Sequence, residues 1–185
     1  MSLTPGFQLG LRRLLWLCLD TQGLEELLER LLCRERRLIV CVGTELREDD
    51  RAGLEVCREL ARRGHEVLEC VYGPENCTHV LVSRRPGRIL IIDAVYMEEA
   101  QPGDIVFVPA AGVASPVLVT THSIPLETTL QYLRSEGAIE DAAVLGIRAE
   151  RLGLGEEMSE VVARAVKRLA EVISSVLSGC PTAQR

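Results

Sequence analysis

Three residues of types that bind divalent metals stand where apolar runs of the chain end: Asp50, Asp93 and His122. Ligand sites of open parallel α/β sheets form outside the carboxyl ends of the strands, so we expect these side chains to meet at one edge of a sheet. Two carboxylates and one imidazole suit a divalent metal that keeps open coordination positions. The runs are LIVCVGTELREDD (38–50), RILIID (88–93) and VLVTTH (117–122).

Each of these residues also has an ordinary structural interpretation when it is taken alone. Asp50 and the preceding Asp49 could be only a cap and a first-turn acid that favour the dipole of the following helix. Asp93 could form a salt bridge or cap the next segment, since a charge at the end of a buried strand is costly unless it is paired or ligated. His122 could be a structural histidine with its hydrogen bonds satisfied.

The motifs of several competing chemistries are missing. The segment GTELREDDRAG (43–53) contains neither a P-loop nor G-x-G-x-x-G, and it places negative charge where an anion would bind, which argues against a nucleotide site. There is no G-x-S-x-G elbow, and no cysteine lies in the setting of an activated nucleophile.

The elements that must position the three residues are predicted from alternating apolar patterns. A chain of 185 residues fits one domain. The alternation predicts an α/β fold: a single three-layer domain with a twisted, mostly parallel sheet of about five strands between helices. Strands are predicted at 38–43, 66–72, 88–93, 104–109, 117–120 and 142–148, and helices at 49–63, 75–84, 125–135 and 156–178.

Residues 1–37 are predicted to form an N-terminal helical extension to an α/β domain at 38–178, and residues 179–185 to form a frayed C-terminal tail. Leucines recur at helical spacing within the extension. A helix packed on the domain is favoured over a partner-binding or dimerising helix, because an apolar stripe must be buried somewhere. The stripe consists of Leu24, Leu27, Leu28, Leu31 and Leu32.

The seven cysteines include no C-x-x-C pair, so a structural zinc site is not expected. Cys41 in a buried strand and Cys57 on the apolar face of a helix are interpreted as small core residues. Cys70 and Cys77 flank the YGPEN turn and could be bridged, which would be unusual in the cytosol except in a hyperthermophile. The sequence leaves that bridge open.

The charge and hydropathy of the chain limit the classes of partner that it can bind. The net charge is −6 and no basic patch is interleaved with aromatic residues, so no nucleic-acid partner is expected. No run is long enough to span a membrane, and the apolar run at 14–19 is too short for a signal peptide. We therefore expect a cytoplasmic protein without a membrane partner.

Several segments, read together, resemble the hydrogenase maturation endopeptidases, the nickel-dependent peptidases that trim the large subunit of [NiFe] hydrogenases. The resemblance covers about residues 38–175 in unbroken order, and it is the combination of segments that is specific. The segments are LIVCVGTELREDDRAG (38–53), YGPEN (72–76), RILIIDAVYM (88–97), PGDI (102–105), TTHSIPL (120–126) and VLGIRAERLGLGEEMS (144–159).

The resemblance implies a site made of the second acid of the first motif, the acid that ends the strand, and the histidine of the T-H motif. These are Asp50, Asp93 and His122, as catalytic and metal-binding residues. Two positions depart from the family pattern: Thr44 replaces an asparagine and Arg51 replaces a glycine. We therefore expect the loop around Asp50 to be shaped differently, with altered substrate choice as one consequence.

The resemblance implies a cytoplasmic hydrolase that cleaves a C-terminal extension from the precursor of a [NiFe] hydrogenase large subunit once nickel is in place. The nickel would be supplied by the substrate, whose soft thiolates retain it, and zinc or another divalent ion could substitute in vitro. The metal could polarise the scissile carbonyl or activate a water. Alternatively, Asp49 or Asp50 could act as general base while the metal only positions the bond.

Two other functions stay open at this point. One is a non-catalytic chaperone or binding module that senses the nickel centre on the same fold, which the departures at Thr44 and Arg51 and the N-terminal extension would suit. The other is a hydrolase of an unrelated peptide that uses its own bound metal. The oligomeric state is not predicted.

Overall fold

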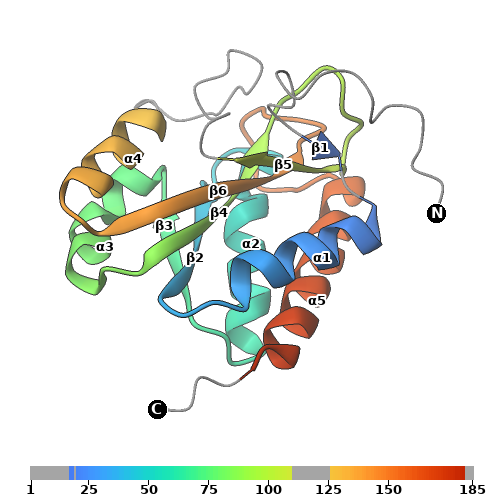
Figure 1. Ribbon diagram of the computed structural model, residues 1–185. Helices are drawn as coiled ribbons and strands as arrows, with labels where there is room; N and C mark the ends of the chain where they lie inside the picture. Colours follow the sequence, from blue (N-terminus) through green and yellow to red (C-terminus); the bar gives the residue numbers. More distant parts are fainter. Residues whose placement is uncertain (1–16, 19, 110–125, 182–185) are drawn as a thin grey trace.

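The computed structural model describes residues 17–18, 20–109 and 126–181 (Figure 1). Its strands are β1 (Leu17–Cys18), β2 (Arg37–Gly43), β3 (Val67–Val71), β4 (Gly87–Val95), β5 (Ile105–Pro109) and β6 (Ile139–Arg148). Its α-helices are α1 (Thr21–Leu32), α2 (Ala52–Arg62), α3 (Thr78–Arg84), α4 (Leu126–Ser135) and α5 (Glu160–Gly179), and its 3₁₀ helices are η2 (Glu48–Arg51) and η3 (Pro74–Cys77).

One sheet runs through the molecule in the order β1-β5-β6-β4-β2-β3 (Figure 1). The pairs β6–β4, β4–β2 and β2–β3 are parallel, whereas β5 is antiparallel to β6 and the two-residue β1 is antiparallel to β5. The predicted mostly parallel sheet is therefore confirmed. From β2 the chain goes to β3 on one side and then to β4 on the other, so the strand order reverses between β2 and β4. Open α/β sheets bind ligands at such a reversal point.

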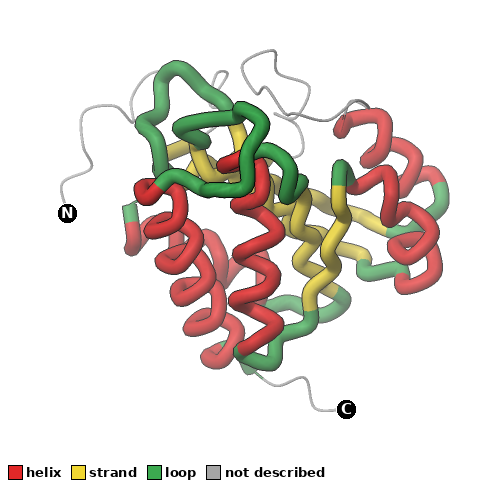
Figure 2. The backbone as a smooth tube through the Cα atoms, turned by 180° about the vertical axis from the view of Figure 1, so that it is seen from behind, coloured by secondary structure: helices red, strands yellow, loops and turns green. Residues whose placement is uncertain are grey.

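Helices cover both faces of the sheet, as the three-layer prediction requires (Figures 1 and 2). Successive side chains of a strand point to opposite faces. In β2, Ile39 and Cys41 belong to one buried cluster with residues of α1, α2 and α5. Leu38 and Val40 belong to a second cluster with residues of α3 and α4. The sheet is thus buried on both faces, which explains the continuous apolar runs of its central strands.

Helix α1 packs on the domain. The side chain of Asp20 accepts a hydrogen bond from the backbone N–H of Gly23 at 2.8 Å and so caps the start of the helix. Leu24, Leu28 and Leu32 are buried in the same cluster as the apolar face of α5. This part of the leucine stripe is covered by the chain itself. No helix among the described residues is both long and apolar enough to cross a membrane.

Some predicted boundaries are corrected by the structure. Strand β4 continues to Val95, so Asp93 lies inside the strand rather than at its end. Helix α5 begins only at Glu160, because residues 149–159 form a hydrogen-bonded loop described below. The predicted strand at 117–120 lies outside the described residues.

The predicted frayed tail is wrong for its first two residues. Gly179 is the last residue of α5, and Cys180 forms a disulfide with Cys33 at the end of α1. This bond fixes the end of α5 to the N-terminal helix. Residues 182–185 lie outside the described part of the chain.

Two further disulfides revise the interpretation of the cysteines. Cys41 and Cys57 are fully buried as predicted, but they are bonded to each other, so reading them as unbonded core residues is wrong. This bond joins β2 to α2. The bond between Cys70 and Cys77, which the sequence left open, closes the turn that follows β3.

Candidate active site

The candidate site lies at the carboxyl edge of the sheet, where the strand order reverses between β2 and β4. Helix α2 begins there, and Gly53 in its first turn packs directly on both strand ends. A Cβ atom at this position would lie 2.2 Å from the carbonyl oxygen of Val42 and 2.5 Å from that of Ile92. Only glycine permits so close an approach of helix and strands. The approach brings η2, which immediately precedes α2, into contact with β4.

Asp50 is positioned by η2. Its backbone N–H donates to the carbonyl oxygen of Arg47 at 2.8 Å, and the residue is 2% exposed. Gly43, the last residue of β2, has φ +147°, and a Cβ atom there would lie 2.1 Å from the carbonyl oxygen of Asp50. Glycine at position 43 therefore lets η2 fold back over the end of the strand and carry Asp50 to the sheet edge.

Asp93 is positioned by β4, where it pairs with Gly146 of β6, and it is also 2% exposed. Since η2 contacts β4, the structure places both acids at the same edge of the sheet, on the two sides of the reversal point. Burial of a carboxylate is tolerated where it is paired, hydrogen-bonded or ligated. Their role as metal ligands stays a prediction.

The third predicted ligand, His122, lies outside the described residues, together with the rest of the segment 110–125. Within the described part of the chain, no group of three or more His, Cys, Asp or Glu side chains could hold a metal ion. Among the described residues, Asp50 and Asp93 are thus the two predicted ligands that can be placed.

Asp49 has a different environment from its neighbour Asp50. Its fully buried carboxylate accepts hydrogen bonds from the backbone N–H groups of Glu150 at 2.8 Å, Arg151 at 2.8 Å and Ser159 at 2.7 Å. It also accepts one from the hydroxyl of Ser159 at 3.0 Å. Asp49 is therefore the anchor of the loop 149–159, a function that the sequence alone did not predict.

Further hydrogen bonds pair this loop with the segment 44–51. The guanidinium of Arg47 donates to the carbonyl oxygen of Leu152, and the carboxylate of Glu48 accepts from the N–H of Gly153 at 2.9 Å. We call the two segments, 44–51 and 149–159, the paired loops. Together the paired loops connect the end of β6 with the end of β2 and pass over the end of β4. The N–H of Ala149 donates to the carbonyl oxygen of Val95 in β4 at 3.0 Å. One side of the site is thus bounded by two loops that are held together by hydrogen bonds.

The residues at the two departures from the family pattern both make local hydrogen bonds. The hydroxyl of Thr44 accepts from the N–H of Leu46 at 3.3 Å, a bond that an asparagine side chain also makes in turns. Arg51 has φ −75° and ψ −8°, which any L residue adopts. Its guanidinium donates to the carbonyl oxygen of Glu156 and contacts Glu55. The expectation of a differently shaped loop with altered substrate choice stays a prediction.

Arginine balances the acids on the outer side of the paired loops. The side chain of Arg58 in α2 bonds both Glu45 and, at 2.8 Å, Glu55. The hydrogen bond from Arg58 lowers the pKa of Glu45, and the same bond raises the pKa of Arg58. Both groups therefore remain charged and paired over the ordinary pH range.

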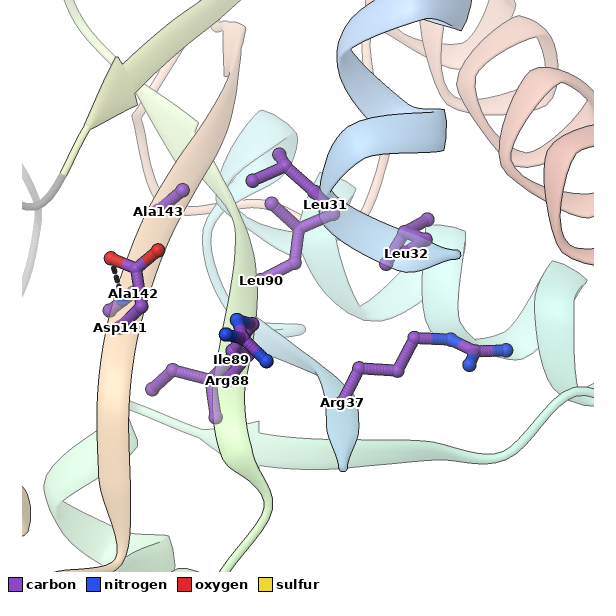
Figure 3. Close-up of a pocket in the computed structure, with 9 residues that line it drawn as sticks. All are labelled: Leu31, Leu32, Arg37, Arg88, Ile89, Leu90, Asp141, Ala142 and Ala143. Carbon is purple, nitrogen blue, oxygen red and sulfur yellow. Dashed lines mark hydrogen bonds between the residues drawn. The ribbon is translucent and has the colours of Figure 1, made fainter. Parts of the chain in front are cut away.

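A small cavity lies at the opposite, amino edge of the sheet (Figure 3). It is lined by the end of α1 and by the first residues of β2, β4 and β6, including Arg37, Arg88 and Asp141. Its volume of about 20 Å³ has room for roughly one water molecule. This cavity is too small for a peptide and lies away from the predicted site residues.

Comparisons with known proteins agree with the fold. A family model described as hydrogenase maturation protease matches residues 54–176. The hydrogenase 3 maturation protease of Escherichia coli K12 is 29% identical over 133 residues, which cover 70% of this chain and 83% of that protein. The crystal structure of the [NiFe] hydrogenase maturation protease HycI from Thermococcus kodakarensis KOD1 superposes with a TM-score of 0.73 at 25% identity, covering 83% of this chain and 99% of that one. HybD from Thermococcus kodakarensis gives 0.67 at 27% identity, covering 77% and 99%.

Proposed function

Because the chain belongs to the hydrogenase maturation protease family, a family of hydrolases, we propose that it removes a C-terminal extension from the large-subunit precursor of a [NiFe] hydrogenase after nickel insertion. In this proposal the nickel is part of the substrate. It is recognised through the carboxylates of Asp50 and Asp93 and the imidazole of His122.

The observation that supports this function best is the placement of Asp50 and Asp93. Both are buried to 98% at the carboxyl edge, on either side of the point where the strand order reverses. Close approaches at Gly43 and Gly53 bring the segment that carries Asp50 onto the strand ends, and β4 itself positions Asp93. Carboxylates are ligand types that divalent metals take, and the carboxyl edge is where open α/β sheets bind ligands, so the placement of the two acids supports the proposed contact with a metal centre.

The chemistry follows from the ligand types. Substrate thiolates are softer donors than carboxylates, so a nickel centre is expected to stay on the precursor while the peptidase contacts it. Hydrolysis then adds one water across the scissile amide and gives a new C-terminal carboxylate and a free amine. Asp49 is a poor general base because its oxygens already accept four hydrogen bonds. Of the two adjacent acids, Asp50 is the one we assign to the reaction.

The test is a cleavage assay with purified precursor, nickel-loaded or nickel-free, in which mass spectrometry reads the new C-terminus. We expect cleavage of the loaded form alone. Asp50→Asn and Asp93→Asn should each reduce the rate at least about a hundredfold, the lower range for removal of a general base or electrostatic group. Asp141→Asn is the matched control, because Asp141 is exposed at the opposite edge and its carboxylate bonds the adjacent Ala142 N–H.

Each remaining outcome points to a different function. Binding of the loaded precursor without any cleavage would identify a chaperone that senses the nickel centre. Cleavage of an unrelated, metal-free peptide after addition of zinc or nickel would identify a hydrolase with its own metal. Full activity of the double variant of Asp50 and Asp93 would refute the assignment of the site.

A further inference from the structure

The exposed large apolar side chains of the described residues are gathered at the edge that holds Asp50 and Asp93. Scattered exposed leucines and tyrosines need no explanation, but apolar residues concentrated around one site are typical of an interaction surface. One of the six, Tyr132, lies on α4, away from this edge. The other five end or follow β2, β3, β4 and β6: Leu46, Val71, Tyr72, Tyr96 and Leu154.

The residues on either side of Leu154 fix its backbone while its side chain is exposed to solvent. It is 88% exposed, and Leu46 on the facing loop is 58% exposed. The N–H of Gly153 donates to the carboxylate of Glu48, and the N–H of Gly155 donates to the carbonyl oxygen of Leu46 at 3.1 Å. The carbonyl oxygen of Gly155 in turn accepts from the N–H of Glu48 at 2.8 Å. Both residues that flank Leu154 are therefore fixed to the facing loop.

This arrangement offers apolar side chains rather than backbone groups to a partner. The backbone hydrogen bonds named above are made between the paired loops themselves. The exposed side chains of the paired loops include Leu46 and Leu154, and we call these two residues the apolar platform. A rigid apolar surface loses little conformational entropy on binding, so its contacts convert efficiently into affinity.

The neighbouring turn shows a second sign of a preformed surface. Tyr72 is 57% exposed and has φ +69°, a conformation that is unfavourable for a bulky L residue. The disulfide between Cys70 and Cys77 closes this turn, and Tyr72 donates its N–H to the carbonyl oxygen of Gly43 at 2.9 Å. Backbone strain of this kind is concentrated at functional surfaces.

We infer that the apolar platform docks an apolar patch on the folded body of the precursor, beside its metal centre, with Tyr72 contacting the same partner. The inference rests on the proposed function and names the surface that the substrate uses. The platform belongs to the same segment, 44–51, as Asp50, so a folded partner that reaches the site meets the platform as well. A preformed surface fits a preformed partner better than a flexible tail.

The test uses the full-length double variant Leu46→Ser/Leu154→Ser and the nickel-loaded precursor. Both side chains are exposed, so the variant should keep the free energy of unfolding of the unchanged protein. Tyr132→Ser is the matched control, because Tyr132 is an apolar side chain 47% exposed on α4. We expect Kd from biolayer interferometry and KM from the cleavage assay to rise at least about tenfold in the double variant, with kcat within about twofold. The control should change none of these quantities.

The outcomes separate this inference from the proposed function. If the unchanged protein cleaves the loaded precursor and the double variant has the same Kd and KM, the platform is not a docking surface although the function stands. If the unchanged protein binds the precursor without cleaving it and the double variant loses binding, docking is supported and the peptidase function fails. Sedimentation velocity supplies a further check: a dimer that becomes monomeric in the double variant would show that a second copy covers the platform, which overturns the inference.

Discussion

Replacing Asp49 by asparagine separates the structural acid of the η2 pair from the acid assigned to chemistry. The substitution keeps the size of the side chain but removes its charge. Three N–H groups and one hydroxyl donate hydrogen bonds to the Asp49 carboxylate. The amide NH₂ of asparagine is itself a donor, so it cannot accept a hydrogen bond from any of them. At least one N–H or hydroxyl partner must therefore lose its acceptor in a fully buried environment.

The size of the effect follows from these four bonds. A hydrogen bond to a charged group contributes about 1.5–3 kcal/mol, and removal of one partner from a buried charged cluster costs about 3–5 kcal/mol. Since the asparagine oxygen retains part of the network, we expect Asp49→Asn to lower the free energy of unfolding by about 3–5 kcal/mol rather than by the sum of four bonds. At roughly 2–4 °C per kcal/mol for a chain of this length, Tm should fall by about 6–20 °C.

Urea unfolding and amide hydrogen exchange measure this prediction. Exchange should accelerate at the N–H groups of Glu150, Arg151 and Ser159, which donate to Asp49. Asp141→Asn is again the control and should leave the unfolding curve within about 0.5 kcal/mol, as is usual for exposed sites. An unchanged Tm and unchanged exchange at these three amides, combined with a large loss of kcat, would refute the structural assignment and make Asp49 the general base.

Three further predictions concern the stability of the fold. Gly53→Ala should lower the free energy of unfolding by at least about 2 kcal/mol, because the strand carbonyls it would touch cannot move aside; Gly179→Ala, where a Cβ meets nothing within 4 Å, is the control in the same urea titration. Burial lowers the pKa of His65 below its ordinary value of 6.5, with Arg63 and Arg37 adding to the effect, so its contribution to stability is present above pH 6.5 and is lost as pH falls through the folded-state pKa. The fall in Tm between pH 7.5 and 5 should thus be smaller in His65→Gln, and an equal fall would contradict the shift. The disulfide between Cys33 and Cys180 links α1 to α5 across a separation of 147 residues. Replacing Cys180 by serine should lower the free energy of unfolding by about 5 kcal/mol on the chain-entropy model. The loss is measured as a lower Tm of this variant in the absence of reductant.

The elements and the edge of the site could be predicted because burial leaves a strong pattern in the sequence. Strand β4 is buried on both faces, so its continuous apolar run identified the strand, although Asp93 was predicted at its end rather than inside it. The strand predicted at 38–43 and the helix predicted at 49–63 likewise located Asp50 near the sheet edge. The same pattern predicted helix α1, since its leucine spacing has only one apolar face to bury.

Features that depend on contacts between distant segments could not be predicted. The partners of Asp49 lie about a hundred residues further along the chain, in a loop that has no apolar periodicity. The disulfides are of the same kind: Cys41 and Cys57 were recognised as buried, but their bond depends on how α2 crosses β2. The start of α5 was misplaced because Glu156 and Ser159, in its first predicted turn, make hydrogen bonds with segment 44–51 instead.

Asp49 and Asp50 show why adjacent acids of one motif should respond differently to the same substitution. A 3₁₀ helix has three residues per turn, so neighbouring side chains of η2 point about 120° apart. Asp49 therefore faces the loop 149–159 while Asp50 is carried to the edge beside β4. A defect caused by Asp49→Asn should follow loop opening, so cleavage should recover at low temperature, where the loop remains closed. A defect caused by Asp50→Asn should persist at every temperature, because the fold is intact and the reacting group is missing. Parallel temperature dependence of kcat in the two variants would show that both acids act through the same structure, and the assignment of separate roles would be wrong.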